Sequence, residues 1–568
     1  MSQNVVVIGA VALGPKAASR LKRVQPDAKV TMIDANDYIS YGGCGIPYYV
    51  SGDVSEASAL QTTMYHLVRD PEFFNDVKGV DVKNLTRATK IDRENKQVLI
   101  KDLKSGEESA LPYDKLVLGT GSLPRKLNLP GEDLEGVHNV GSLNEAIRIR
   151  ESISKGQVGK AVIVGAGFIG LEMAEAFADM WGIEVDVVEI ADQILPGLTS
   201  PTLAQMGQNH MEQNDVRFHF GDSVTAIEGE DGKVKKVITS KGEIEADLVI
   251  LSAGVVPCDE LAKDAGLDVH ERGGILVNNM MQTSDPDIYA GGDCVLIKNE
   301  ITGEPLFLPL GSMSNRQGRV IGNNLAGGHQ TFDGASGSWV VKLFETSMSG
   351  VGLSLPAAKR AGFDAETAMV ITQDRAHFYP EKALMVLEAV VERGTRRVLG
   401  VQGFGAYGDA MVGRINVVAA MLKNKPTVDD LSNVEIAYSP PFAAAMDILN
   451  TLGNVADNVL SGLNTVVSPE EFIALWENRN DDLFFLDCRE TADADPYLEK
   501  YPEWHNIPQG HLAKRINEVP KDKRIVLMCN TGTRSYEAQV IMDANGIKNC
   551  ANVKGGLAGL RNLGYTLI

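Results

Sequence analysis

The chain has 568 residues, 44% of them hydrophobic and 23% charged, with a formal net charge of −21 at pH 7. This length exceeds what one hydrophobic core normally organises, so we expect three or four domains. The negative charge argues against a nucleic acid or an anionic membrane as partner, because both need a basic binding surface. The apolar N-terminus lacks the charged region and cleavage site of a signal peptide, so we expect a cytoplasmic protein.

The cysteines are few and widely spaced, in neither a disulfide framework nor a CxxC metal-binding pattern. We therefore predict no metal site and expect any special cysteine to be reactive. Cys44 and Cys529 are the candidates. The remaining cysteines stand in strand-like or apolar surroundings and are interpreted as packing residues: Cys258, Cys294, Cys488 and Cys550.

A β-α-β pattern opens the chain, with a β-branched run over residues 4–9 and a second run that ends at Asp34. The turn has Gly9 and Gly14 of a phosphate-binding loop but Val11 in place of the middle glycine, so the motif alone is weak. Asp34 closes the second strand, where a carboxylate can hold a ribose hydroxyl. A glycine-bounded turn of an ordinary parallel α/β protein is the alternative.

A second, cleaner copy follows in AVIVGAGFIGLEMAEAFADMW, which has Gly165, Gly167 and Gly170 after a strand and at a helix start. These glycines allow a tight turn, a close approach to a pyrophosphate and close helix packing. Glu189 ends the next strand, where its carboxylate would repel a 2′-phosphate. The pattern therefore favours NADH over NADPH.

Two dinucleotide folds in one chain indicate a resident flavin that a nicotinamide recharges. The segments KLVLGTGSLPRKLNLPG, with Thr120 and Gly121, and TSDPDIYAGGDC, with Asp293, resemble two signatures of the flavoprotein disulfide reductases. The resemblance implies FAD, with Asp293 at its ribitol. The segment from about residue 331 resembles the dimerisation domain of that family, which implies a homodimer.

Cys44 lies in YISYGGCGIPYYVSG, where the surrounding glycines let backbone lie close to a flat partner and leave the sulfur unscreened. The residues after Cys44 look helical, so we expect the helix N-terminus to stabilise a thiolate that faces a flavin. Ile39 occupies the position at which a C-x4-C redox pair would have its other cysteine. Cys44 must therefore pair with an external sulfur.

The same segment resembles the single-cysteine motif SFxNCGxPYxxSG of the CoA-disulfide reductases, a family that includes NADH oxidases and persulfide reductases with fused rhodanese domains. The resemblance implies CoA as the external thiol and assigns Tyr379 and Tyr438 to the sulfur site of the neighbouring subunit. It also matches Ser40 to a serine near the CoA thiol. Gly43 replaces the asparagine of the motif, which weakens the assignment of the substrate. A basic cluster on the first helix is suited to the CoA phosphates, with an ordinary solvated helix face as the alternative: Arg20, Lys22 and Arg23.

A second reactive centre is predicted in RIVLMCNTGTRSYEAQVIM, where a buried strand leads into a tight loop after Cys529 and a helix opens at Ser535. Backbone amides of this loop can converge on the sulfur as a thiolate or persulfide. The loop, together with LDCRE and IPQGHL, resembles rhodanese domains, although Cys488 stands where they usually have valine. A phosphatase is the alternative for this loop, but phosphatases have five residues between the cysteine and the arginine, and this loop has four between Cys529 and Arg534. The loop residues after the cysteine are Asn530, Thr531, Gly532, Thr533, Arg534 and Ser535.

The expected fold is α/β, with two Rossmann-like dinucleotide-binding domains, an α+β dimerisation domain and a C-terminal rhodanese-like domain. The expected bounds are 1–120 and 250–330 for FAD binding, 121–249 for NAD binding, 331–455 for dimerisation and 466–568 for the rhodanese-like domain.

The predicted function is an FAD-dependent oxidoreductase that uses NADH to reduce CoA persulfide, polysulfide or CoA disulfide through Cys44, while Cys529 handles sulfane sulfur. Two alternatives stay open: an NADH oxidase or peroxidase that cycles Cys44 through a sulfenic acid, and a sulfurtransferase that carries persulfide on Cys529.

Overall fold

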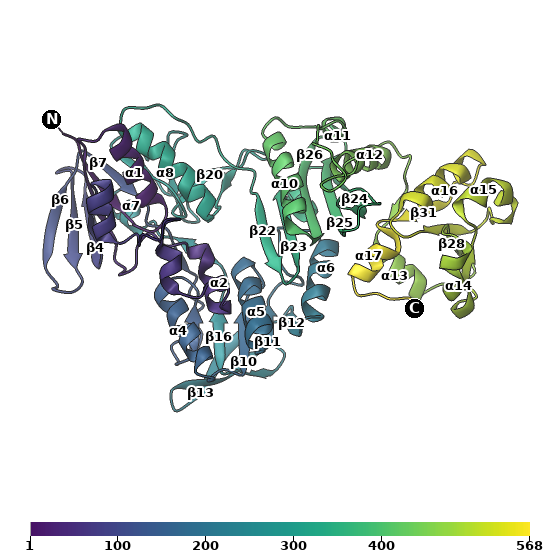
Figure 1. The fold of residues 1–568 in the computed structure, drawn as a ribbon, viewed down its shortest axis with the longest axis horizontal. Coiled ribbons are helices and arrows are strands. Elements are labelled where there is room, and N and C mark those ends of the chain that lie inside the picture. Colours follow the sequence, from purple (N-terminus) through teal and green to yellow (C-terminus); the bar gives the residue numbers. More distant parts are fainter. Residues whose placement is uncertain (1) are drawn as a thin grey trace. The chain divides into compact units, whose positions relative to one another are not determined.

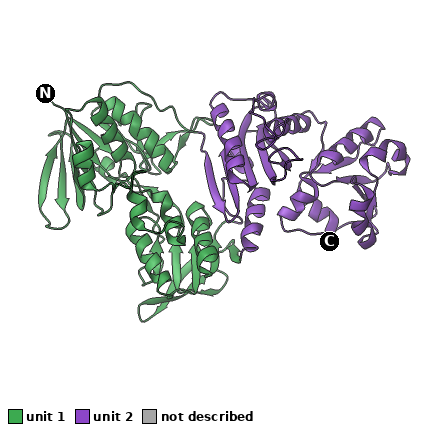
Figure 2. Cartoon of the chain, in the orientation of Figure 1, with its two compact units in different colours: residues 1–191, 215–335 green, residues 192–214, 336–568 purple. Residues whose placement is uncertain are grey.

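The computed structural model describes residues 2–568, which form two compact units (Figure 2). Unit 1 consists of Met1–Ala191 and Asp215–Ala335, and unit 2 of Asp192–Asn214 and Ser336–Ile568. Within the described residues, no helix is long and apolar enough to cross a membrane.

The first sheet of unit 1 is parallel and is built from distant parts of the chain (Figure 1). Its order is β19-β7-β1-β2-β3, and the strands span Ile288–Ala290, Lys115–Leu118, Asn4–Ile8, Lys29–Ile33 and Asp81–Lys83. The helices α1 (Leu13–Val24) and α8 (Gly311–Leu325) pack against each other beside it. Apart from the edge strand β3, which is largely exposed, the strands are short apolar runs that are mostly buried, as a helix-covered parallel sheet requires. This is the first predicted dinucleotide-binding fold.

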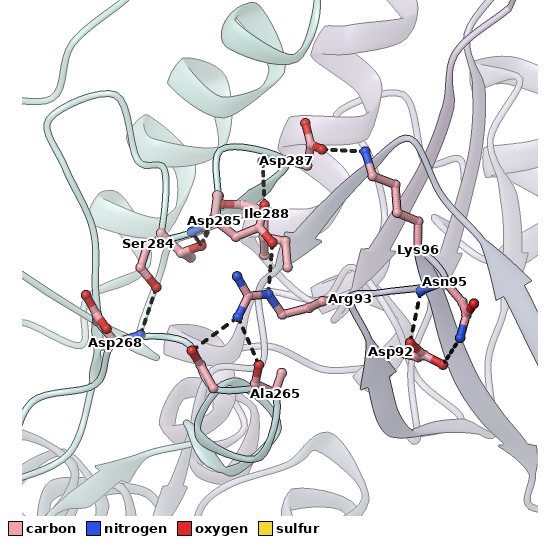
Figure 3. A network of polar contacts seen from close by, with 12 residues as sticks. Asp92, Arg93, Asn95, Lys96, Ala265, Asp268, Ser284, Asp285, Asp287 and Ile288 are labelled. Atoms are coloured by element: carbon pink, nitrogen blue, oxygen red, sulfur yellow. Dashed lines mark hydrogen bonds and ion pairs between the residues drawn. The ribbon is translucent and has the colours of Figure 1, made fainter.

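A small antiparallel sheet is attached to this part of unit 1 through polar contacts (Figure 3). It comprises β4 (Thr86–Asp92), β5 (Gln97–Asp102) and β6 (Glu108–Pro112). In the turn after β4, the Nε of Arg93 lies 2.9 Å from Asp285 Oδ2, and its Nη1 donates to the carbonyls of Ala265 and Gly266. Lys96 reaches Asp287 in the same segment at 2.5 Å. These contacts join the sheet to the segment that leads into β19.

The second parallel sheet of unit 1 has the order β12-β11-β10-β16-β9. Its central strand β10 (Lys160–Val164) leads through the glycine loop into α5 (Phe168–Trp181), which returns to β11 (Glu184–Glu189). The outer strands are β12 (Val216–Phe220), β16 (Leu248–Leu251) and β9 (Val137–Asn139). The β-α-β order repeats that of the first fold, so the predicted pair of Rossmann-like domains is confirmed.

Unit 2 begins with an antiparallel sheet of order β22-β23-β26-β25-β24. The strands span Trp339–Leu343, Thr346–Gly352, Val398–Ala406, Leu384–Glu392 and Ala365–Gln373. Three helices pack on this sheet: α6 (Pro201–Glu212), α10 (Gly408–Leu422) and α12 (Ile448–Leu460). An antiparallel sheet with separate helices is the α+β class that the sequence predicts.

The C-terminal part of unit 2 is a parallel sheet of order β27-β31-β30-β28-β29. The strands span Val466–Val467, Cys550–Val553, Arg524–Met528, Leu483–Asp487 and Trp504–Asn506. Five helices cover it: α13 (Pro469–Glu477), α14 (Thr491–Lys500), α15 (Gln509–Arg515), α16 (Thr533–Ala544) and α17 (Gly556–Asn562). Helix α16 begins earlier than predicted, because Gly532 adopts φ +102° and serves as its N-cap. Lys554 Nζ lies 2.8 Å from Thr367 Oγ1 of β24, which joins this domain to the antiparallel sheet.

Candidate active site

The two glycine loops of unit 1 have the same backbone geometry. Gly9 and Gly165, which begin the loops, have φ of +102° and +109°. A Cβ on Gly14 would lie 1.9 Å from the carbonyl oxygen of Gly9, and a Cβ on Gly170 would lie 2.0 Å from that of Gly165. A Cβ on Gly167 would meet no protein atom within 4 Å, so space stays open before α5. Neither α1 nor α5 has a side chain that caps its first amides. Helix N-termini without a side-chain cap and open backbone fit a pyrophosphate in each loop.

Asp34 and Glu189 occupy matching positions at the ends of β2 and β11, and both are buried. Asp34 Oδ2 accepts from the Ala10 amide at 2.7 Å, and Glu189 Oε2 accepts from the Ala166 amide at 2.7 Å. Each carboxylate thus holds its own glycine loop in shape. An acceptor fixed beside a phosphate loop is suited to a ribose hydroxyl.

Asp293 follows β19 at the carboxyl edge of the first sheet. Its Oδ2 lies 3.4 Å from Ser122 Oγ and its Oδ1 lies 3.3 Å from Ser314 Oγ. Burial raises the pKa of Asp293, although these hydroxyls oppose the shift. Near Ser122, the Thr120 hydroxyl donates to the Cys258 carbonyl at 2.6 Å, and Gly121 has φ +72° with open space beside it. This edge fits the sugar chain of a flavin nucleotide.

Cys44 is exposed and lies on a 3-10 turn, Gly43–Gly45, directly before α2 (Ile46–Ser51). A Cβ built on Gly311 would lie 3.5 Å from its Sγ, so the N-terminus of α8 is also next to the sulfur. Desolvation of the sulfur and then the charge of Glu172 raise the pKa of Cys44, whereas the Gly311 amide lowers it. The thiolate expected from the sequence is thus favoured by the amide of a second helix, α8, and opposed by desolvation and by Glu172.

The residues predicted to bind CoA lie on α1 and beside the Cys44 loop. Arg20 Nε donates to Asn323 Oδ1 of α8 at 2.5 Å, and Arg23 Nε donates to Ser19 O at 2.9 Å. Lys22 Nζ lies 2.6 and 2.9 Å from the carbonyls of Pro26 and Ala28, so its ammonium is bound to its own loop. Ser40 is buried with φ +49°, and its amide donates to Ala10 O.

Cys529 lies at the carboxyl end of β30 and is 1% exposed. Its Sγ lies 3.1 Å from the Gly532 amide and 3.3 Å from the Ser535 hydroxyl. Asn552 of β31 holds the loop, with Oδ1 2.6 Å from Ser535 Oγ and Nδ2 donating to Gly532 O at 3.2 Å. The sulfur therefore lies in a small loop of donors at the start of α16. Thr533 is exposed, as is Asn530, whereas Thr531 and Arg534 are half-buried.

Comparisons with known proteins agree with this arrangement. Residues 3–314 match the profile "Pyridine nucleotide-disulphide oxidoreductase", residues 340–449 match the dimerisation domain of that family, and residues 468–563 match "Rhodanese-like domain". The chain belongs to the pyridine nucleotide-disulphide oxidoreductase family. It is therefore an oxidoreductase that carries a rhodanese-like domain.

Three similar proteins illustrate this membership. The "NAD(P)H sulfur oxidoreductase (CoA-dependent)" of Pyrococcus abyssi is 36% identical over 80% of this chain and 98% of that protein. The NAD-dependent persulfide reductase of A. fulgidus superimposes with a TM-score of 0.92 at 38% identity, covering 98% of this chain and 99% of the other. The Bacillus anthracis protein CoADR-RHD gives a TM-score of 0.89 at 32% identity, covering 99% and 98%.

Tyr379 and Tyr438 both belong to unit 2 of this oxidoreductase, whereas Cys44 belongs to unit 1. Tyr379 is half-buried and Tyr438 is 50% exposed. Arg414, a buried residue of α10 that sequence reasoning missed, donates to the carbonyls of Asp374 and Phe442 at 3.2 Å each. It therefore joins the two segments that carry the tyrosines. In the sequence, Arg414 stands out as a lone arginine in an apolar helical pattern, which is typical of a buried arginine with a polar partner.

Glu172 and Tyr48 were also missed, and both lie near Cys44. Burial and then Glu175 raise the pKa of Glu172 to about 7. Burial and then Glu172 raise the pKa of Tyr48 to about 12. The two side chains line one pocket between α2 and α5. In the sequence, only the spacing of Glu172 and Glu175 in LEMAEAF indicates this pair. An acidic pair on one helix face is usually solvated, so that spacing does not by itself predict a site.

Proposed function

We propose that this oxidoreductase uses NADH to reduce CoA persulfide, polysulfide or CoA disulfide at Cys44, and that Cys529 handles the sulfane sulfur. The observation that carries the proposal is the setting of Cys44: an exposed thiol beside the first amide of α8, with Ile39 where a second redox cysteine would stand. Such a thiol needs an external sulfur partner. The names of the Pyrococcus abyssi and A. fulgidus proteins support a sulfur substrate.

The proposed cofactors follow from the two loops. FAD would lie along Gly9, Gly14 and Asp34 and at the sheet edge near Asp293. NADH would use the second loop, where the buried Glu189 carboxylate would repel a 2′-phosphate. CoA would approach the face of α1 that carries Arg20 and Arg23, because guanidinium groups pair well with phosphates.

The residues around Cys44 support nucleophilic chemistry. FAD, when bound, would pass the electrons of NADH to this sulfur. Cys44 attacks the substrate sulfur, and hydrosulfide or a thiolate leaves while the Gly311 amide offers a hydrogen bond to the cysteine sulfur. Tyr379 and Tyr438, supplied by the second subunit of a homodimer, would protonate the leaving group.

The exposure of apolar side chains around Tyr438 supports the homodimer. Phe442 is 71% exposed and Phe378 is 64% exposed, although aromatic rings of this size are normally covered. Both belong to the segments that Arg414 joins. A second subunit would cover these rings and receive the tyrosines.

Cys44→Ser tests the function. The variant should retain FAD and lose NADH-driven sulfide release from CoA persulfide, because a serine oxygen forms no mixed disulfide. Cys258→Ser is the matched control, a half-buried thiol of the same unit that should keep full activity. Sulfide and oxygen are measured together for each NADH consumed. Sulfide release by Cys44→Ser at the wild-type rate would overturn the proposal, and oxygen consumption without sulfide would identify an oxidase.

A further inference from the structure

Cys488 and Cys529 follow two strands that lie side by side. Strands β28 and β30 are parallel and pair Leu486 with Leu527 and Asp487 with Met528. The Cys488 amide donates to Met528 O at 2.8 Å, so the ladder continues past the named strands. The two cysteines are therefore the next residues in register. Neighbouring strands lie about 4.8 Å apart, and Cα atoms about 4.4–6.8 Å apart suit a disulfide.

The side chains of the two cysteines belong to the same face of the sheet. Leu486 and Leu527 are members of one buried apolar cluster, and Cys488 belongs to that cluster as well. Because side chains alternate along a strand, Cys529 follows Leu527 on that face. The sequence suggests only a packing role for Cys488, but its neighbour on the adjacent strand is the reactive Cys529.

The two thiols differ in their surroundings. Cys529 has the Gly532 amide and the Ser535 hydroxyl within hydrogen-bonding distance of its sulfur. Cys488 is fully buried, and the polar contact of its sulfur is with Leu486 O at 3.8 Å. Burial, and then the nearby Cys529, raise the pKa of Cys488. Cys529 is thus equipped to receive sulfur first, and Cys488 to keep its proton until the outer sulfur of the Cys529 persulfide takes it.

Burial also limits which thiol can reach a sulfur held on Cys529. The residue is 1% exposed, so a bulky acceptor has poor access to a persulfide there, whereas Cys488 is already adjacent. A neighbouring thiol has a far higher effective concentration than one in solution.

We propose that Cys488 is the resolving thiol of Cys529, converting its persulfide into an internal disulfide with release of sulfide. The Cys488 sulfur bonds to Cys529 Sγ, the bond from that atom to the outer sulfur breaks, and the proton of Cys488 leaves with the outer sulfur as hydrogen sulfide. The outer sulfur is reduced and the two cysteines are oxidised. This step rests on the proposed function, which makes Cys529 the sulfur acceptor.

A small thiol completes the cycle. Two thiol molecules reduce the Cys488–Cys529 disulfide and become a small-molecule disulfide themselves. That thiol has to be small, because the Cys488 and Cys529 sulfurs are both buried.

The test uses the full holoenzyme loaded with inorganic polysulfide in the absence of NADH, then desalted, alkylated and digested without reductant. The wild type should yield a peptide pair cross-linked through Cys488 and Cys529, with sulfide released in equal amount. In Cys488→Val, the Cys529 peptide should stay one sulfur atom heavier and persist at least ~10-fold longer, because its internal acceptor is absent. Valine keeps the position apolar and of similar size.

Cys550→Ser is the matched control, because Cys550 is buried in the same sheet but pairs with Ile525 at the opposite end of β30. It should behave as the wild type. A thiol oxidant without polysulfide should also cross-link Cys488 to Cys529, and failure to do so would overturn the inferred adjacency. If the Cys529 persulfide lasts equally long in the wild type and in Cys488→Val, and no cross-link forms, the proposed role of Cys488 as resolving thiol is overturned, while Cys529 remains the sulfur acceptor. If Cys529 takes up no sulfur in either protein, the proposed sulfur-acceptor function fails.

Discussion

The guanidinium of Arg414 lies 2.7 Å from the Asp447 carboxylate, and both side chains are buried. Asp447 also caps α12 by accepting from the Leu449 amide at 3.0 Å. Arg414 and Asp447 therefore join α10 to the start of α12 and to the segments that carry Tyr379 and Tyr438.

Arg414→Leu should destabilise unit 2 by about 3–5 kcal/mol, because Asp447 would keep a buried charge without its partner. Sulfide release should fall through kcat as the tyrosine segments loosen. Arg396→Leu is the control: the side chains of its pair with Asp457 at 2.7 Å are 33% and 44% exposed, so the pair should contribute less than about 1 kcal/mol. Urea unfolding and steady-state kinetics measure both effects. Equal destabilisation by the two variants would contradict this reading.

Glu189→Gln should weaken the preference for NADH, because it removes the charge that repels a 2′-phosphate. The NADPH to NADH ratio of kcat/KM should rise roughly 10-fold, equivalent to about 1.4 kcal/mol. Asp34→Asn removes the matching charge in the first fold, and it should reduce FAD retention without changing the nicotinamide preference. A wild-type enzyme that already prefers NADPH would show that Glu189 does not select the cofactor.

The stability of the enzyme should depend on pH through Glu172, whose pKa is raised from 4.5 to about 7. Between these values the folded state binds more protons than the unfolded state, so the free energy of unfolding falls as pH rises. The fall should be on the order of 1–3 kcal/mol, since the carboxyl is partly exposed. Above about pH 7 the loss is complete, and below about pH 4.5 it is absent.

Glu172→Gln should remove most of this decline and be more stable than the wild type at pH 8, with little difference at pH 5. Glu151→Gln changes an exposed carboxylate that pairs with Lys155 at 3.4 Å, and it should leave the pH profile unchanged. Unfolding curves at the two pH values give the comparison. A Glu172→Gln protein that loses stability with pH as steeply as the wild type would assign the decline to other groups.

Mixed dimers test whether the tyrosines act across subunits. Cys44→Ser and Tyr438→Phe chains should each be nearly inactive, and mixing equal amounts should restore about a quarter of the wild-type activity, since half of the dimers regain one of two sites. Tyr407→Phe, at another exposed tyrosine of unit 2, should be active before mixing. Absence of recovery after verified subunit exchange would place Tyr438 outside the neighbouring site.

Local patterns were enough to predict the fold class and the main elements. Glycines at fixed distances after a buried strand predict both loops, because only glycine tolerates the backbone at Gly9 and Gly165. Asp34 and Glu189 could be found as well, since each ends the next strand. The Cys44 and Cys529 loops were recognisable for the same reason: the chemistry and the backbone constraint lie within a few consecutive residues.

Only the tertiary structure brought together residues from distant segments. Gly311 lies beside Cys44, Arg414 joins the two tyrosine segments, and Cys488 stands next to Cys529, although no sequence pattern links these pairs. Helix packing and strand register decide such contacts. A shift of one residue between β28 and β30 would turn one cysteine to the other face of the sheet. The sequence alone therefore determined which groups can react, and the register and packing decided which of them meet.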